Sequence, residues 1–193
     1  GYLRQILPDE SGDAALKADR IIGVFRQPTF IDKQIKMFVA VKSGAAYQLY
    51  TYTYEQKTSG SDIITCVGKK DITSWAGGMS DDCKMFTNGV EVPLNYLYIA
   101  KGNDLWRTSY KSQADPKAVK SFPAPITAAE VVISTPNTIS ENTKELYTAI
   151  FTYDTSAKTS KMYVLDARTD DLKAYSEVET AIPGKVVRYL ANQ

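Results

Sequence analysis

Histidine is absent from this 193-residue chain. Without histidine, the chain cannot form a Ser-His-Asp triad, a Cys-His dyad or a zinc site with a histidine ligand. Any acid–base chemistry would depend on carboxylates, tyrosine, lysine or cysteine. Glycine-rich phosphate loops of the G-x-x-x-x-G-K-[ST] or G-x-G-x-x-G type are also missing. We therefore predict no cofactor and no metal, and the sequence favours a non-catalytic protein over an enzyme.

Cysteine occurs only twice, as Cys66 and Cys83. Two cysteines are too few for a disulfide scaffold, and these two lie too far apart for a C-x-x-C redox motif. In an oxidising compartment they could form a disulfide that stabilises the fold by up to about 3 kcal/mol in the chain-entropy model. The alternative is two separate thiols, each packed as a small apolar residue. The sequence leaves both open.

A strong charge of one sign and a long apolar run are also lacking. The formal net charge is +1 and the basic residues are scattered, which argues against a nucleic-acid surface.

No apolar run approaches the roughly 20 residues of a membrane span, and the start shows no signal-peptide pattern. Gly1 in place of Met indicates a processed or engineered start, which leaves open a longer protein. Hydrophobic residues make up 44% of the chain, so we expect a folded core.

Three stretches place aromatic and β-branched residues on both sides of a polar turn. In the clearest of them, two apolar runs flank Lys101-Gly102-Asn103-Asp104, where Gly and Asn suit the positive φ of a tight reversal. This pattern predicts β-hairpins near residues 35–54, 95–110 and 145–166. Further strands are expected at residues 21–25, 63–67, 85–86, 90–92, 128–133 and 186–190.

Residues 1–20 form the least regular part of the sequence, and we expect an irregular lead-in there. Asp13 could cap a short helix over residues 14–18, the best helix candidate in the chain. Residues 111–125 are polar and contain three prolines, so they are predicted to be a connection. The remaining chain, residues 21–193, is expected to form a single β domain.

The three predicted hairpins recur about every 50 to 60 residues, a spacing typical of β-propeller blades. A propeller needs at least about four blades. Either residues 58–94 contain a fourth blade or the chain is part of a larger ring. The predicted fold class is therefore all-β, built of repeated antiparallel hairpins in a partial or small β-propeller-like architecture. A β-sandwich is the alternative.

Four stretches carry a resemblance to a known family: Asn95–Trp106, Ile150–Asp154, Met162–Asp166 and Gly184–Arg188. They resemble the C-terminal part of the PKD-like family lipoproteins of gut Bacteroidetes, in which a propeller-like β region follows immunoglobulin-like domains. The resemblance implies a cell-envelope protein, outer-membrane attached or periplasmic, found alongside glycan-uptake machinery. It supplies no catalytic residues. This chain shows no lipobox cysteine and no recognisable PKD-like domain.

Trp75 and Trp106 are the candidates for stacking on a sugar, because a flat aromatic face suits a pyranose. Trp75 lies in an irregular stretch, residues 73–82, and its alternative role is to anchor that loop. Trp106 lies within a predicted strand, where a role in the core is favoured because tryptophan buries a large area. Both residues are predicted ligand-binding positions.

Asp81 and Asp82 are the other predicted ligand-binding residues. Their carboxylates could supply oxygen ligands to Ca²⁺, but their spacing matches no calcium-loop template, so a solvated acidic turn is favoured. The stripe of Tyr50, Tyr52 and Tyr54 could form a binding platform, although such stripes more often pack between sheets. We favour the core for these tyrosines.

Together these features predict a non-catalytic cell-envelope binding module associated with glycan capture or uptake, with a glycan or a partner protein as its ligand. The first alternative is a structural or assembly component that makes protein contacts through exposed strand edges. A glycosidase is less favoured, because it needs two carboxylates about 5 to 9.5 Å apart and nothing in the sequence singles out a pair.

Overall fold

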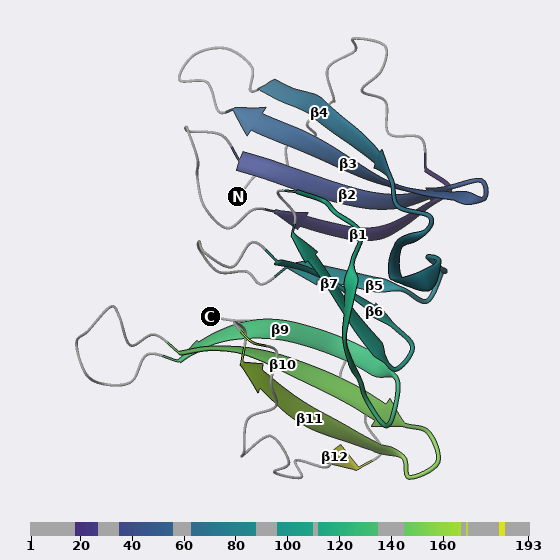
Figure 1. Ribbon diagram of the computed structural model, residues 1–193, viewed down its shortest axis with the longest axis vertical. Helices are drawn as coiled ribbons and strands as arrows, with labels where there is room; N and C mark the ends of the chain where they lie inside the picture. The colour runs from purple at the N-terminus through teal and green to yellow at the C-terminus, as the bar shows by residue number, and fades with distance from the viewer. Residues whose placement is uncertain are drawn as a thin grey trace, which may run out of the picture. The chain divides into compact units, whose positions relative to one another are not determined.

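The computed structural model describes residues 18–26, 35–55, 63–87, 96–109, 112–134, 145–166, 169 and 182–183. Most of these residues lie in strands, which form three four-stranded antiparallel sheets (Figure 1). No helix in this part of the chain is long and apolar enough to cross a membrane. Cα proximities divide the chain into two compact units, Gly1–Asp81 and Asp82–Gln193. Each unit is described separately.

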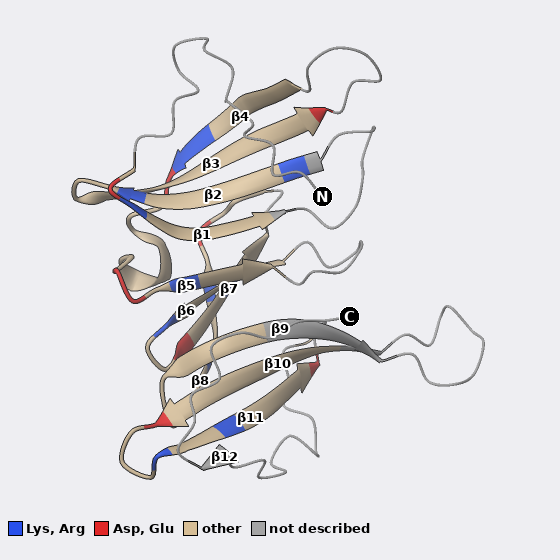
Figure 2. Cartoon of the chain, turned by 180° about the vertical axis from the view of Figure 1, so that it is seen from behind, with Lys and Arg blue, Asp and Glu red and all other residues tan. Residues whose placement is uncertain are grey.

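The first unit contains one sheet with strands in sequence order: β1 (Arg20–Arg26), β2 (Ile35–Ser43), β3 (Ala46–Glu55) and β4 (Ile63–Asp71). Strands β2 and β3 form the predicted hairpin, in which Ser43 pairs with Ala46 across a two-residue loop. Gly44 opens this loop with φ of 60°, a conformation that glycine adopts without steric cost. Figure 2 shows charged residues near the ends of β2 and an otherwise uncharged strand between them.

Strand β3 is buried on both faces at its centre. Leu49 lies on one face with 0% exposure, and Tyr50 and Tyr52 lie on the other with 2% and 6%. The two tyrosine rings stack with centroids 6.2 Å apart and pack with Val41 into an apolar cluster. The preference for a core role is confirmed for these two tyrosines, and Tyr54 is half-buried.

The second unit contains two sheets, each again in sequence order. The first consists of β5 (Lys84–Thr87), β6 (Tyr96–Lys101), β7 (Asp104–Ser109) and β8 (Lys117–Ser121). The other consists of β9 (Ile126–Ser134), β10 (Glu145–Asp154), β11 (Thr159–Asp166) and β12 (Ile182–Pro183). Side chains from both sheets share one apolar core, formed by Tyr98, Ala100, Leu105, Phe122, Ile126, Ile150 and Leu165. Strand β6 is buried on both faces, because Leu97 and Ile99 on its other face are also 0% exposed.

The β6–β7 turn fixes the segment that joins these two sheets. Gly102 has φ of 55°, whereas Asn103 does not adopt a positive φ. The side-chain amide of Asn103 instead donates to the carbonyl of Phe122 at 3.1 Å, and the Phe122 N–H donates to the Asn103 carbonyl at 2.9 Å. The N–H of Ile126 donates to the Gly102 carbonyl at 2.8 Å. The turn therefore holds the start of β9 in place.

The fold-class prediction is confirmed: the described chain is all-β, and the three predicted hairpins are β2–β3, β6–β7 and β10–β11. Its open sheets fit a partial propeller or a β-sandwich. The strands predicted at residues 21–25, 63–67, 85–86 and 128–133 lie within β1, β4, β5 and β9. The predicted strands at 90–92 and 186–190 fall outside the described residues, as do most of the predicted helix at 14–18 and most of the predicted lead-in at 1–20.

Two other assignments differ from the structure. The predicted connection at 111–125 contains β8, because a strand there satisfies the outer backbone groups of β7 despite the flanking prolines. Within residues 58–94, the described strands β4 and β5 complete the first and second sheets and do not form a fourth. The two compact units also contrast with the single domain that was predicted for 21–193.

Both cysteines are thiols in the structure. Cys66 is half-buried on β4, with its Sγ 3.6 Å from the Gly68 carbonyl oxygen, and Cys83 is buried. Of the two alternatives that the sequence left open, the structure contains the separate thiols.

Candidate functional site

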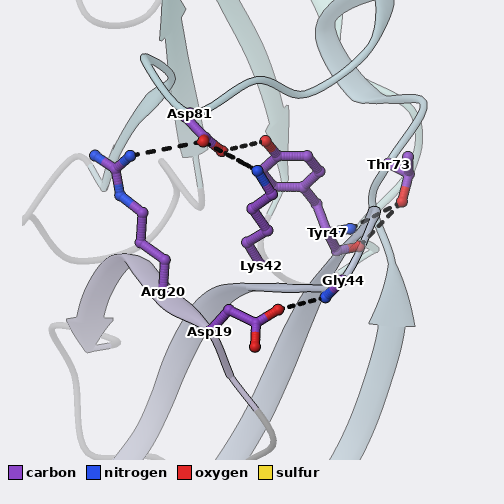
Figure 3. Close-up of polar contacts among 7 residues, drawn as sticks. All are labelled: Asp19, Arg20, Lys42, Gly44, Tyr47, Thr73 and Asp81. Carbon is purple, nitrogen blue, oxygen red and sulfur yellow. Dashed lines mark hydrogen bonds and ion pairs between the residues drawn. The ribbon is translucent and has the colours of Figure 1, made fainter.

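A set of polar contacts in the first unit surrounds the loop from Ile72 to Asp81, which follows β4 (Figure 3). The loop begins by hydrogen-bonding to the start of β3. The Ile72 N–H donates to the Tyr47 carbonyl at 2.9 Å, and the Tyr47 N–H donates to Thr73 Oγ1 at 2.9 Å. Asp71 Oδ1 accepts the Thr73 N–H at 2.8 Å. The first residues of the loop therefore continue the hydrogen bonding between β4 and β3.

The loop ends at Asp81, whose carboxylate is bound by three side chains from the sheet. Lys42 Nζ donates to both oxygens, at 2.9 and 3.0 Å, and the Tyr47 hydroxyl donates to Oδ1 at 2.6 Å. Arg20 lies farther away, with NH1 3.8 Å from Oδ2. We call Arg20, Lys42, Tyr47 and Asp81 the Asp81 cluster. Figure 3 shows the side chains of Arg20, Lys42 and Tyr47 converging on the Asp81 carboxylate.

A second aspartate holds the β2–β3 turn from the other side. Asp19 Oδ2 accepts the Gly44 N–H at 2.6 Å, and the Asp19 N–H donates to the Lys42 carbonyl at 2.8 Å (Figure 3). The turn is therefore fixed by carboxylates from two distant parts of the sequence.

The electrostatics of the Asp81 cluster keep each group in its ordinary charge state at neutral pH. The hydrogen bond from Tyr47 and the contacts with Lys42 lower the pKa of Asp81. The hydrogen bond to Asp81 raises the pKa of Lys42 and also raises the pKa of Tyr47. A general acid or base works best with a pKa near the working pH, and all three shifts lead away from it. These shifts suit a structural role, in which the cluster attaches the end of the loop to the sheet.

Between these two anchored ends the loop makes a tight turn at Trp75–Gly77. Ala76 has φ of 52°, an uncommon conformation for a residue with a Cβ, and Gly77 and Gly78 follow with φ of 69° and 102°. The indole of Trp75 is 1% exposed, and Lys70 Nζ lies 5.7 Å from its ring centroid. Among the described residues, the indole N–H of Trp75 has no hydrogen-bond partner, although it is buried. Burial of this ring anchors the turn.

The two tryptophans that were predicted as sugar-stacking positions differ in exposure: Trp75 is buried and Trp106 is half-buried. Trp75 has no exposed face on which a pyranose could stack, so the structure favours the alternative role of loop anchor. Trp106 lies on β7 in the second unit and is half-buried. Its indole N–H is buried and has no hydrogen-bond partner in the part of the chain that the structure describes. Its position opposite the fully buried Ile99 favours a core role.

The two predicted aspartates have different surroundings. The carboxylate of Asp81 is neutralised by Lys42 and Arg20, which disfavours a divalent cation there. Asp82 is exposed and belongs to the second unit. Among the residues that the structure describes, no group of three or more Asp, Glu, Cys or His side chains could hold a metal ion.

Sequence reasoning missed the partners of Asp81. Lys42 lies 39 residues before Asp81 and Tyr47 lies 34 residues before it. Lys42 was part of a predicted turn and Tyr47 part of a predicted strand, and neither position carries a local pattern that points to a distant carboxylate. A single sequence contains no signal that would pair them.

No protein-family model matches the chain, and no significant match occurs among curated proteins or solved structures.

Proposed function

We propose that this chain is a non-catalytic binding module of the cell envelope that contacts a protein partner through the edges of its first sheet. The observation that carries the proposal concerns exposed apolar side chains. Among the described residues, the large hydrophobic side chains that are exposed all lie on β1 or β4: Ile21 (55%), Val24 (66%), Ile63 (40%) and Val67 (54%).

Strands β1 and β4 are the two edges of the first sheet, each hydrogen-bonded to a neighbour on one side. An edge strand carries backbone donors and acceptors along its outer side, which form a template for another strand. Peptide recognition by strand addition uses these backbone groups for affinity and the adjacent side chains for specificity. Exposed valine and isoleucine on both edges supply the apolar component of such contacts.

A non-catalytic role is supported by the Asp81 cluster. It is the most extensive arrangement of titratable groups around the loop at 72–81, and its pKa shifts stabilise the resting charge states of those groups. The envelope location and the link to glycan uptake come from the family resemblance of the sequence. Because Trp75 is buried, the main residue predicted to stack on a sugar has no exposed face. This burial favours a protein partner over a glycan.

Site-specific photocrosslinking tests this function. A photoreactive amino acid is introduced at Val24 or Val67 on the two edges, with exposed Ser156 in the β10–β11 turn as the matched control. The full chain is irradiated in the cells that naturally produce it, and adducts are identified by mass spectrometry. We expect a defined protein adduct from an edge position and none from Ser156. Defined adducts at neither edge, together with binding to a glycan panel, would replace this proposal with the glycan function.

A further inference from the structure

We infer that β4 is a self-complementary edge, and that its partner is a second copy of this chain, paired antiparallel about Thr65. This inference deepens the proposed function, on which it rests, by naming the partner of one edge. It depends on the order of side chains along β4 and on their exposure.

Strand β4 separates its side chains into two rows. Ile64 and Cys66 are half-buried against the tyrosine cluster of the first sheet, whereas Ile63, Thr65 and Val67 are exposed. The exposed row is apolar at both ends and has a threonine at its centre. Beyond Val67 the strand changes character, since Lys69, Lys70 and Asp71 complete it. Figure 2 shows this change along β4, from an uncharged first half to a basic second half.

Antiparallel pairing about Thr65 brings like side chains together. Thr65 lies opposite the partner's Thr65, and Ile63 lies opposite the partner's Val67, twice by symmetry. Threonine pairs and β-branched pairs directly opposite each other on one face stabilise antiparallel strands. The contact is isologous, so it closes at two copies and does not propagate into a fibre.

Other pairings of the same edges are less favourable. Antiparallel pairing of β4 about Val67 would place Ile63 opposite the partner's Asp71 and Thr65 opposite the partner's Lys69. Pairing of β1 with its own copy about Gly23 would bring two arginine positions, 20 and 26, opposite each other. Like charges directly opposite destabilise a strand pair. The side-chain order therefore selects β4 and the Thr65 register.

The irregularity in the β3–β4 register limits the pairing to a short segment. The register shifts between Thr51 and Tyr52 of β3, which face Gly68 and Cys66 of β4, so Val67 is the extra residue of a β-bulge. A bulge and nearby lysines are devices that restrict the growth of an edge. A segment this short buries less area than the standard interface of roughly 1,600 Å². We therefore expect a weak dimer, formed at roughly 0.1 to 1 mM.

Sedimentation equilibrium of the purified full chain tests the inference. The parent chain is compared with Thr65→Lys, which places two ammonium groups opposite each other in the dimer, and with Ser156→Lys, which adds the same charge at an exposed turn. Circular dichroism verifies that each variant is folded. We expect at least a tenfold weaker dimer for Thr65→Lys and less than a twofold change for Ser156→Lys.

Disulfide trapping determines the register in a Cys66→Ala background. Thr65→Cys alone should form a covalent dimer under mild oxidation, because residues directly opposite in an antiparallel pair lie within disulfide range. A covalent dimer formed only when Thr65→Cys is mixed with Lys69→Cys would overturn the Thr65 register. A chain that stays monomeric at 1 mM, or a dimer unaffected by Thr65→Lys, would overturn the inference. A different protein crosslinked at Val67 in a monomeric chain would overturn it while supporting the proposed function.

Discussion

The Tyr47 hydroxyl and the Asp81 carboxylate, 34 residues apart in the sequence, are joined by a hydrogen bond of 2.6 Å. Tyr47 stands at the start of β3 and is buried, whereas Asp81 ends the loop that follows β4. The same tyrosine binds the first residues of that loop through its backbone N–H and carbonyl. One residue therefore fixes both ends of the loop.

This relationship predicts the effect of Tyr47→Phe. The substitution retains the buried ring and removes only the hydrogen bond to Asp81, so the distal end of the loop loses one of its three side-chain contacts and keeps those with Lys42 and Arg20. We expect the melting temperature to fall by roughly 2 to 4 °C. Backbone amides of residues 75–80 should exchange faster with solvent in a hydrogen-exchange measurement. Tyr153→Phe in the second unit is the matched control. If both variants lost the same hydrogen-exchange protection at residues 75–80, the Tyr47–Asp81 hydrogen bond would not be what holds the loop.

The pKa of Asp81 predicts a pH dependence of the same loop. Its pKa is lowered in the folded chain, first by the hydrogen bond from Tyr47 and then by Lys42. A carboxyl group whose pKa falls on folding contributes stability above its unfolded pKa of about 3.9, and this contribution is lost as the pH falls through the lower folded value. Loop protection should therefore decrease below about pH 4.

Asp81→Asn checks this dependence. The amide cannot ionise, so the variant should show weaker loop protection at pH 7 and a flatter dependence on pH in the acid range. Asp115→Asn, at another exposed position, serves as the control and should retain the parent profile. An unchanged acid profile in Asp81→Asn would show that another carboxyl group controls the loop.

The hairpins could be predicted from sequence because their information is local. Gly44 and Gly102 each open a two-residue loop with positive φ, and apolar alternation flanks both turns. Strand β8 was missed because its pairing partner, not its own composition, determines it. The environment of Trp75 could not be predicted either, because its burial depends on a turn in which a non-glycine residue, Ala76, adopts a positive φ.

The Asp81 cluster shows a further limit of sequence reasoning. Its aspartate was identified as a candidate, but the choice between calcium ligand and solvated turn depended on cations that the sequence places far away. Coulomb attraction acts through space, and the pairing of β2 with β3 determines which lysine lies near Asp81. Sequence thus indicated the residue, and the fold determined its role.

Tyr52 predicts a loss of stability at alkaline pH. Burial raises the pKa of Tyr52 to about 12, with smaller contributions from Cys66 and Tyr50. The folded chain therefore holds the phenol proton more tightly than the unfolded chain, whose tyrosines titrate near 10. The contribution is complete below about pH 10 and is lost as the pH rises toward 12.

Denaturant unfolding between pH 8 and 12 measures this effect. Tyr52→Phe keeps the ring in the cluster and removes the ionisable hydroxyl, so its stability should fall less steeply over that range. Tyr153→Phe, in the second unit, is the matched control. Parallel slopes for Tyr52→Phe and the parent would assign the alkaline loss to another group.

Two buried threonines in the second unit predict opposite effects of one substitution. The Oγ1 of Thr148 on β10 is buried and has no hydrogen-bond partner among the residues that the structure describes, and Thr148 is 0% exposed. Thr108 on β7 is 7% exposed, but its hydroxyl donates to the Ala114 carbonyl at 2.5 Å. Valine has nearly the same shape as threonine and cannot form a hydrogen bond.

Because a buried hydroxyl without a partner costs desolvation energy, Thr148→Val should leave the free energy of unfolding unchanged or raise it by about 1 kcal/mol. Thr108→Val removes a hydrogen bond that is made and leaves the Ala114 carbonyl without this donor, so it should lower that free energy by roughly 1 to 2 kcal/mol. Denaturant unfolding of both variants and the parent gives the comparison directly. Both substitutions replace a hydroxyl with a methyl group in the same unit, so the sign of their difference depends on hydrogen bonding and not on a change of volume. If Thr148→Val destabilises the chain as much as Thr108→Val, the Thr148 hydroxyl must find a donor or acceptor in solution.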